Sequence, residues 1–204
     1  SSRRVDAERG AVAHQPGCRG PPSKGGRGGV LASLQMTSSS RAVDYDALAA
    51  TTSIKDMVED ELNRWTLASL KQDDKHYDYL SRLRLCSEDN AVNHGDYFPG
   101  SSEELGWLGH FAKKSAHLEE IEIYGSNIFK YCSTQSVDEF FEDLGTCSLI
   151  ETFFLIFTDL TEIIHKLGPV MKNNDITHWY MDGCYMGAAD ANDLFNNFRY
   201  MKSQ

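Results

Sequence analysis

Histidine and cysteine are the side chains here best suited to nucleophilic, acid–base or metal chemistry, and the 204-residue chain contains seven and five of them. The histidines form no H-x-x-x-H or H-E-x-x-H set and the cysteines no C-x-x-C pair, so the spacing of a zinc site is missing. Cys184 lies close enough to His178 in sequence to suggest a Cys–His nucleophile. The strand pattern described below directs Cys184 into a core turn and His178 outward, so we predict that the two do not meet.

Other motifs that carry chemistry are also missing from the sequence. It contains no G-x-G-x-x-G, Walker A or G-x-S-x-G motif, and the glycines at 25–29 follow no strand. Acidic clusters such as Glu119, Glu120 and Glu122 lack the geometry of a calcium loop and are better explained as a solvated face. We therefore predict that the chain is not an enzyme and uses no cofactor or metal.

The charge balance narrows the classes of partner. A net charge of −10 argues against binding to nucleic acid or to an anionic membrane, both of which attract clustered Lys and Arg. The longest apolar stretch, residues 153–157, is far shorter than a membrane span. Five irregularly spaced cysteines and the lack of an Asn-x-Ser/Thr sequon indicate reduced thiols and predict a cytoplasmic protein.

The first 35 residues differ from the rest in composition. They are rich in Gly and Pro and carry six basic against two acidic side chains, which predicts a disordered tail. A targeting segment, an RNA-contacting Arg/Gly tail, a segment read into the gene in error and a plain disordered tail are the alternatives, and the last two fit best. With residues 37–50 taken as linker, the sequence predicts a tail over 1–50 and a domain over 51–204.

A helix followed by a recurring strand–helix unit is predicted for this domain. The helix occupies residues 53–72, and the strands lie at 79–86, 117–124, 148–155 and 175–182. Each strand carries the pattern apolar-x-x-apolar-x-apolar, which indicates one buried face. The three core positions of the successive strands are Leu80, Leu83, Leu85; Leu118, Ile121, Ile123; Leu149, Thr152, Phe154; and Ile176, Trp179, Met181. The third strand fits worst, because Thr152 takes a core position.

Amphipathic helices are predicted between and after the strands. Ser101 or Ser102 caps the first, and Ser136 and Asp159 open the second and third as capping boxes with Glu139 and Glu162. Asp190 opens the last. Gly168-Pro169 and Asn173-Asn174 are expected to stop helices, and residues 90–100 to form a long loop.

This unit resembles the leucine-rich-repeat family of the ribonuclease-inhibitor type. The resemblance covers residues 79–203, with leucine largely replaced by Ile, Phe, Trp and Met. The best match is Ile176-x-x-Trp179-x-Met181-x-x-Cys184, which has Cys184 at the family's Asn/Cys position. The resemblance implies an α/β solenoid with parallel strands on its concave face, helices on its convex face, and a partner protein on the concave face.

The strand residues between the core positions would line that concave face. Three lateral rows are expected: Arg82, Glu120, Glu151, His178; then Arg84, Glu122, Phe153, Tyr180; then Cys86, Tyr124, Leu155, Asp182. We predict that the partner-binding residues are Arg82, Arg84, Glu120, Glu122, Tyr124, Phe153, Leu155, His178, Tyr180 and Asp182. The alternative for the charged residues is that Arg82–Glu120 and Arg84–Glu122 are only cross-strand ion pairs.

Two other functions remain open at this point. Degenerate matches to the pattern also arise in ordinary strands, so a small α/β enzyme is one alternative, and a reordered sheet with a deep pocket would distinguish it. A fragment of a ubiquitin-ligase substrate receptor is another, although residues 53–72 show no F-box. The last strand–helix unit has no polar cap, which suggests association through that end.

Overall fold

The computed structural model describes residues 43–71, 79–173 and 175–198. The predicted disordered tail over residues 1–35 lies outside them. The helices are α1 (Tyr45–Ala49), α2 (Ile54–Met57), α3 (Glu61–Lys71), α4 (Ser102–Ala112), α5 (Thr134–Gly145), α6 (Gly168–Lys172) and α7 (Ala188–Phe198). The strands are β1 (Arg82–Cys86), β2 (Asp96–Tyr97), β3 (Glu120–Tyr124), β4 (Thr152–Ile156) and β5 (His178–Asp182). Three 3-10 turns complete the order: η1 (Glu88–Asn90), η2 (Leu160–Glu162) and η3 (Ile164–Lys166).

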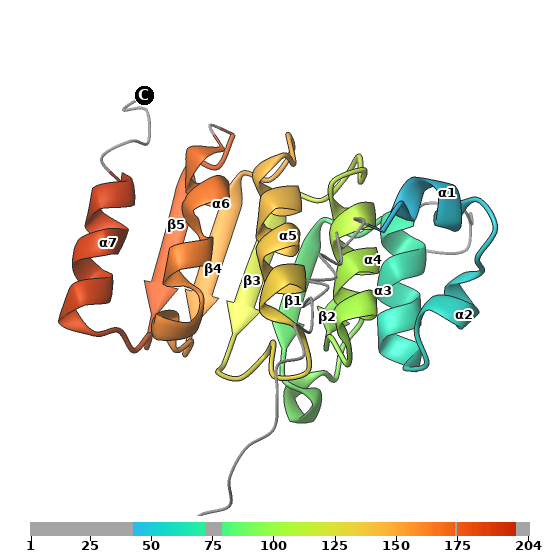
Figure 1. Cartoon of the computed structure of the whole chain (residues 1–204), viewed down its shortest axis with the longest axis horizontal. Coiled ribbons are helices and arrows are strands. Elements are labelled where there is room, and N and C mark those ends of the chain that lie inside the picture. The colour runs from blue at the N-terminus through green and yellow to red at the C-terminus, as the bar shows by residue number, and fades with distance from the viewer. Residues whose placement is uncertain (1–42, 72–78, 174, 199–204) are drawn as a thin grey trace, which may run out of the picture. The chain divides into compact units, whose positions relative to one another are not determined.

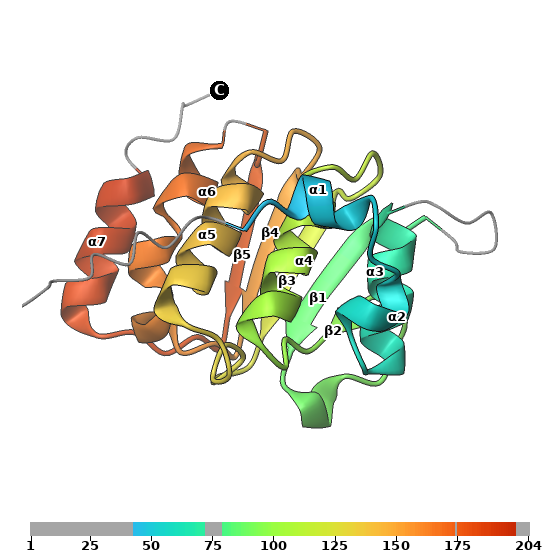
Figure 2. The same cartoon turned by 45° about the vertical axis from the view of Figure 1, so that its right-hand side comes forward.

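The five strands form one parallel sheet in the order β2-β1-β3-β4-β5. Apart from the short β2, each strand lies beside the next one in sequence, because a helix or a set of helical turns returns the chain to the starting end. Figures 1 and 2 show α4, α5, α6 and α7 side by side over one face of the sheet. In the described part of the chain, no helix covers the opposite face. The fold is therefore α/β, with a sheet covered by helices on one face.

The core lies between the sheet and the helices. Leu83 and Leu85, Ile121 and Ile123, and then Phe153 and Leu155, stack in lateral rows beneath the helices. All six side chains are completely buried, and burial of each contributes about 1.5–3 kcal/mol. From the helix side, α5 supplies the predicted stripe of Val137, Phe140, Phe141 and Leu144.

The predicted register of β4 is wrong by one residue. Ile150, Phe153 and Leu155 are completely buried, and Leu149, expected in the core, is exposed. Successive strand side chains point to opposite faces, so a shift of one residue exchanges every side chain between core and solvent. Phe153 and Leu155 therefore belong to the core and not to the uncovered face. Glu120 pairs with Thr152, and Glu122 with Phe154.

Helix starts differ from the prediction in three places. Ser101 caps α4 as expected, accepting a hydrogen bond from the Glu104 N–H, but α5 is capped by Ser133 rather than by Ser136. The segment after Asp159 forms η2 and η3 instead of one helix, although its predicted core residues Leu160, Ile163, Ile164 and Leu167 are all buried. Gly168-Pro169 starts α6 rather than stopping a helix, because the fixed φ of proline suits the first turn.

The region before β1 holds three helices where one was expected. Val58 has extended φ and ψ, which separates α2 from α3, and Asp60 accepts a hydrogen bond from the Asn63 N–H at the start of α3 (2.9 Å). Residues 45–49, predicted to be linker, form α1. The Tyr45 ring meets the Trp107 ring edge-on at 4.8 Å. Packing against α4 therefore makes α1 part of the folded domain.

The same hydrogen bond occurs after two consecutive strands. The Thr158 hydroxyl donates to the Ile123 carbonyl oxygen at 3.0 Å, and the Cys184 thiol donates to the Leu155 carbonyl oxygen at 3.2 Å. Each donor follows the last core residue of its own strand by three positions and reaches the equivalent residue of the preceding strand. These contacts tie neighbouring strand–helix units together where their strands end. As predicted, Cys184 points into the turn.

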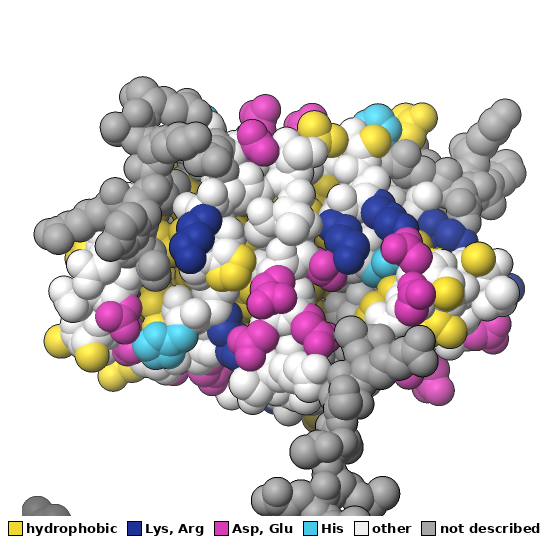
Figure 3. All heavy atoms as spheres, turned by 45° about the horizontal axis from the view of Figure 1, so that its top comes forward, with side chains coloured by type: hydrophobic (Ala, Val, Ile, Leu, Met, Phe, Trp, Pro, Cys, Tyr) yellow, Lys and Arg dark blue, Asp and Glu magenta, His cyan; other side chains and the backbone are white. Residues whose placement is uncertain are grey.

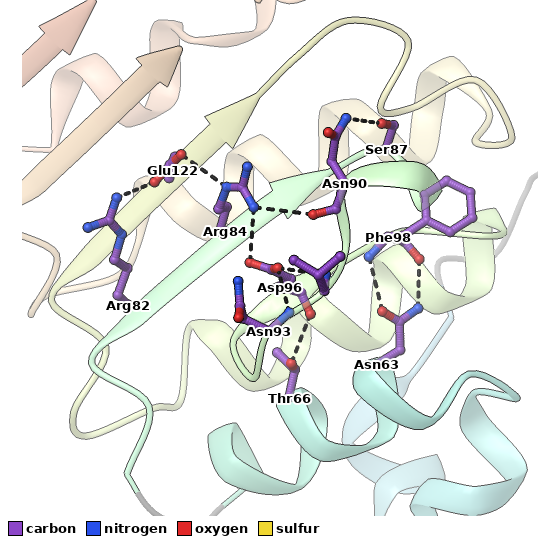
Figure 4. Close-up of polar contacts among 11 residues, drawn as sticks. Asn63, Thr66, Arg82, Arg84, Ser87, Asn90, Asn93, Asp96, Phe98 and Glu122 are labelled. Atoms are coloured by element: carbon purple, nitrogen blue, oxygen red, sulfur yellow. Dashed lines mark hydrogen bonds and ion pairs between the residues drawn. The ribbon is translucent and has the colours of Figure 1, made fainter. Parts of the chain in front are cut away.

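Side chains of α3 close the β2 edge of the sheet. The Asn63 amide donates to the Phe98 carbonyl oxygen (2.6 Å) and accepts from the Phe98 N–H (3.0 Å), as Figure 4 shows. The Thr66 hydroxyl donates to the Asp96 carbonyl oxygen at 3.1 Å. Residues 90–100, expected to be only a loop, thus contain a short strand whose outer backbone groups are satisfied by a helix.

The register of β4 can be tested by comparing two adjacent phenylalanines. Phe153→Ala removes a buried ring, so we expect it to lower the free energy of unfolding by about 3–5 kcal/mol. Phe154→Ala trims a ring on the other face of the strand, and its cost should be less than half as large. Urea unfolding followed by circular dichroism measures both. A larger cost for Phe154→Ala would contradict the register.

A second prediction concerns His110, which is buried in α4 beside the rings of Tyr45 and Phe111. Burial, reinforced by the charge of Lys114, lowers the pKa of His110, while Asp46 acts in the opposite direction. The folded protein therefore holds this imidazole neutral. As the pH falls below about 6.5, the ordinary histidine pKa, the unfolded chain takes up a proton that the folded protein does not, and stability is lost.

We expect the wild type to lose more free energy of unfolding between about pH 7.5 and pH 5.5 than His110→Gln does. Urea unfolding at the two pH values measures the difference. The variant serves as the control for every other group that titrates in this range. Equal losses in the two proteins would show that His110 does not contribute.

Candidate functional site: the uncovered face of the sheet

Twelve side chains of β1, β3, β4 and β5, with Asp96 of β2 beside Arg84, form the face of the sheet that faces away from the helices, which we call the open face. In register, its rows are Arg82, Glu120, Thr152, His178; then Arg84, Glu122, Phe154, Tyr180; then Cys86, Tyr124, Ile156, Asp182. Eight of the ten predicted site residues lie in these rows. Phe153 and Leu155 do not, and Phe154 and Ile156 take their positions. Likewise, Thr152 replaces Glu151 in the first row.

Glu122 is held between two arginines at the centre of this face. Its carboxylate accepts a hydrogen bond from the Arg84 Nε–H (3.1 Å) and forms an ion pair with the Arg82 guanidinium, as Figure 4 shows. These neighbours leave Glu122 only 4% exposed although no described helix covers it. Arg82 also reaches Glu120, at 3.6 Å. The predicted cross-strand pairs are confirmed, and a diagonal contact from Arg82 to Glu122 links them.

Arg84 also fastens the loop before β2. Its NH1 group donates to the Asp96 carboxylate and to the Asn90 carbonyl oxygen, both at 3.3 Å. The other carboxylate oxygen of Asp96 accepts from the Val92 and Asn93 N–H groups, both at 2.9 Å. Burial disfavours the charge on Arg84, but neighbouring acids, with Asp96 foremost, outweigh it and raise the guanidinium pKa. Arg84 is therefore fully charged and fixed in place.

Aromatic rings extend this charged centre across the face. The Arg84 guanidinium lies 4.1 Å from the centre of the Tyr124 ring, and the Arg82 guanidinium lies 4.9 Å from that of Phe154. Phe154 in turn stacks on Tyr180, with the ring centres 5.0 Å apart. Contacts of this kind each contribute about 0.5–1.5 kcal/mol. We call the connected set of Arg82, Phe154 and Tyr180 the aromatic strip.

Phe157 flanks the open face in an unusual backbone conformation. Its φ is +51°, which costs about 1–2 kcal/mol for a residue with a side chain, and its ring is 56% exposed. The ring meets Tyr124 edge-on at 5.9 Å. It also lies against Gly183, where a Cβ atom would fall 2.3 Å from a ring carbon. Strained backbone positions cluster at functional sites, which makes Phe157 a candidate member of one.

Sequence reasoning missed Asp96, Phe154 and Phe157 as members or neighbours of this face. The polar Thr152 at a predicted core position was the available sign of the error in β4. Moving the register by one residue puts Phe153 at that core position and turns Phe154 to the open face. Asp96 follows an Asn-His-Gly turn, which is a sign of local hydrogen bonding. The positive φ of Phe157 left no sign in the sequence.

The thiols and histidines do not combine into a reactive site in the described residues. Burial raises the pKa of Cys86 and of Cys132 to about 11 and that of Cys147 to about 12, so these thiols react weakly at neutral pH. Cys184 and His178 have separate partners, the Leu155 carbonyl oxygen and the Thr177 hydroxyl. Across residues 43–71, 79–173 and 175–198, no three His, Cys, Asp or Glu side chains are placed to hold a metal ion.

Two hollows lie elsewhere on the surface. One, of about 240 Å³, is lined by residues including Lys130, Cys132 and Lys166. The other, of about 420 Å³, lies at the start of α4 beside Asp56, Glu59 and Glu104. Burial raises the pKa of Glu104, and the Gly100 N–H, which donates to it at 2.8 Å, counteracts this. Both hollows are open, and neither includes a residue of the open face.

The face of the molecule drawn in Figure 3 has no large area of only acidic or only basic side chains. Figure 3 looks onto the molecule with the top of Figure 1 brought forward, and acidic and basic side chains are interspersed there. None of the helices in the described residues has the length and apolar character needed to span a membrane. Searches against protein-family models and curated proteins find no match to this chain.

The buried carboxylate of Glu122 can be tested against its exposed neighbour. Glu122→Gln removes the charge that two guanidiniums share, so we expect it to lower the free energy of unfolding by about 1–3 kcal/mol. Glu120→Gln, in a half-exposed pair, should cost less than about 1 kcal/mol. Urea unfolding of both variants provides the comparison. Equal losses of unfolding free energy in the two variants would mean that the ion pairs of Glu122 contribute no more than an ordinary surface pair.

Proposed function

We propose that this domain is a protein-interaction module built as a leucine-rich-repeat solenoid of the ribonuclease-inhibitor-like type, and that the open face binds the partner without catalysis. The observation that carries the proposal is the aromatic strip. Arg82, Phe154 and Tyr180 are the residue types that dominate binding hot spots. They lie together on a sheet face that no described helix covers.

Three features support the solenoid. From β1 to β5 the strands that pair are consecutive, apart from β2, and all run in one direction. With the register of β4 corrected, four apolar-x-x-apolar-x-apolar patterns begin at Leu80, Leu118, Ile150 and Ile176, and the last spacing of 26 residues falls within the family's range of about 20–29. Finally, the donors at Thr158 and Cys184 occupy the family's Asn/Cys position and bond to the preceding unit.

The order of side chains on the open face also suits binding. Arg82, Arg84, Glu122 and Asp96 fix one another, so the guanidiniums and the rings on which they lie lose little freedom when a partner arrives. The buried charges are already paired within the domain. Phe154, Tyr180 and the exposed Phe157 ring are thus left as the main source of affinity.

The alternatives have less support. A doubly wound enzyme binds its ligand where the strand order reverses, and the order here has only the short β2 out of sequence, at an edge that α3 closes. A ligase receptor fragment would need its helices before β1 to bind an adaptor. In this chain α3 is used to close the sheet and to pack against α4.

The test is affinity capture with the full chain as bait, followed by quantitative mass spectrometry. The variant Phe154→Ala with Tyr180→Ala removes the rings of the aromatic strip and should reduce recovery of the true partner at least tenfold, as loss of two hot-spot rings predicts. The matched control, Tyr79→Ala with Tyr131→Ala, removes two exposed aromatic rings outside the open face and should keep the partner. Circular dichroism checks that both variants are folded.

A photoreactive residue at position 180 should then form a crosslink to the same partner, whereas one at position 131 should not. A protein that both double variants retain, or that crosslinks only through position 131, would show that the open face is not the binding site. Turnover of a metabolite by the wild-type chain, lost in neither double variant, would instead support the enzyme alternative.

A further inference from the structure

The two edges of the sheet differ in how their backbone groups are satisfied. At β2 the edge is two residues long, and Asn63 and Thr66 close it. At β5 the edge is five residues long, and in the described part of the chain no strand or side chain bonds to its outer backbone groups. An open strand edge is a template for pairing with another strand.

Core positions become exposed at the β5 edge. Met181 pairs with Leu155 and occupies the row of Leu85 and Ile123, yet it is 39% exposed where those three are completely buried. The Trp179 Nε1 atom is buried without a hydrogen-bond partner. Phe195 on the neighbouring α7 is 66% exposed. This end of the core is therefore incompletely covered by the described chain.

The hydrogen bonds to β4 show which backbone groups of β5 face outward. The His178 N–H donates to the Glu151 carbonyl oxygen, and the Asp182 carbonyl oxygen accepts from the Phe157 N–H. Successive residues of a strand turn their backbone groups to alternate sides, so residues 178, 180 and 182 bond to β4. The free donors and acceptors at the edge are therefore those of Trp179 and Met181.

We propose that the occupant of this edge is a second copy of the chain, with β5 pairing antiparallel to β5 about a two-fold axis beside Tyr180. This register places each free residue opposite a free residue, because Trp179 faces Met181 of the other copy. Each Trp179–Met181 pair exchanges two backbone hydrogen bonds, which makes four in all, with Cα atoms about 5.5 Å apart. The two Tyr180 residues form the closer, non-hydrogen-bonded pair between them. This inference does not depend on the proposed function of the open face.

The side chains of β5 are complementary in this register. On the open face, His178 lies opposite Asp182 of the other copy at both ends. The His178 Nδ1 atom is engaged by the Thr177 hydroxyl, which leaves Nε2 for a carboxylate. On the helix side, the thioether of Met181 meets the indole of Trp179, a favourable sulfur–aromatic contact. The two Tyr180 rings, each about half exposed in the single chain, lie side by side.

Self-pairing explains this pattern better than another occupant. A two-fold pairing closes on itself, whereas parallel addition of strands would leave a new open edge each time. If a strand from a different protein were the occupant, His178 and Asp182 at the two ends of β5 would have no reason to be complementary to one another. Stable interfaces bury about 1,200–2,000 Å² of accessible surface, and the pairing of two five-residue strands buries less than that. The dimer is therefore expected to be weak and concentration-dependent.

Sedimentation velocity of the full 204-residue chain, over about a hundredfold range of concentration, tests the proposal. The wild type should pass from monomer to dimer. His178→Asp alone places two carboxylates opposite one another at two symmetric points, and Asp182→Lys alone replaces the carboxylate that would accept from His178 with an ammonium group. Each should weaken the dimer about tenfold. Combining the two substitutions puts an aspartate opposite a lysine at both points and should return the affinity to within about threefold of the wild type.

Asp89→Lys provides the matched control for Asp182→Lys. It makes the same Asp-to-Lys change at an exposed position in η1, beside the opposite edge of the sheet. It should leave the association unchanged. A chain that stays monomeric throughout would overturn the proposal, as would a dimer that the single charge changes do not weaken. A double variant that fails to recover would also overturn it, since the antiparallel register requires the exchange to be reciprocal.

Discussion

Burial of alternate strand side chains beneath a single layer of helices is the constraint on which the rest of this structure depends. It sends Leu83, Ile121 and Phe153 into one continuous core and, in the same step, sends Arg84, Glu122 and Phe154 to the open face. The strands are parallel and in register, so equivalent residues form lateral rows, and the ion pairs and ring contacts of the open face arise from those rows. The contents of the open face thus follow from the packing on the other side.

The same constraint creates a difficulty at the ends of the sheet, because a strand buried on one side still has backbone groups at its edge. At β2 the chain meets this with a very short strand and with polar side chains from α3. At β5 the described chain offers only α7, which packs Leu194 and Phe198 against the core but leaves Met181 partly uncovered. The two ends are therefore not equivalent, and the second is the natural place for association.

Much of this arrangement could be predicted from the sequence, and the errors have identifiable physical causes. Strands β1, β3 and β5 end where the pattern places them, since charged residues alternate with apolar ones in β1 and β3. In β4 the run from Phe153 to Phe157 is apolar throughout, so the period of two disappears and only Thr152 marks the register. The breaks at Val58 and around Ile163 depend on tertiary packing, which local patterns of capping residues do not record. Asp96 was missed because its role depends on an arginine twelve positions away.

Tyr180 connects the two surfaces discussed above, because it ends the aromatic strip and also lies at the centre of the β5 edge. Antiparallel pairing of β5 keeps the same side of both sheets facing outward, so the open faces of two copies would continue into one another across the axis. The two Phe154–Tyr180 stacks would then lie next to each other as a single apolar area flanked on both sides by Arg82. A partner with two equivalent segments would bind such a surface more tightly than two separate domains, since the second contact becomes intramolecular. Self-pairing at the β5 edge would therefore turn one binding surface into two linked ones without changing any residue of the open face.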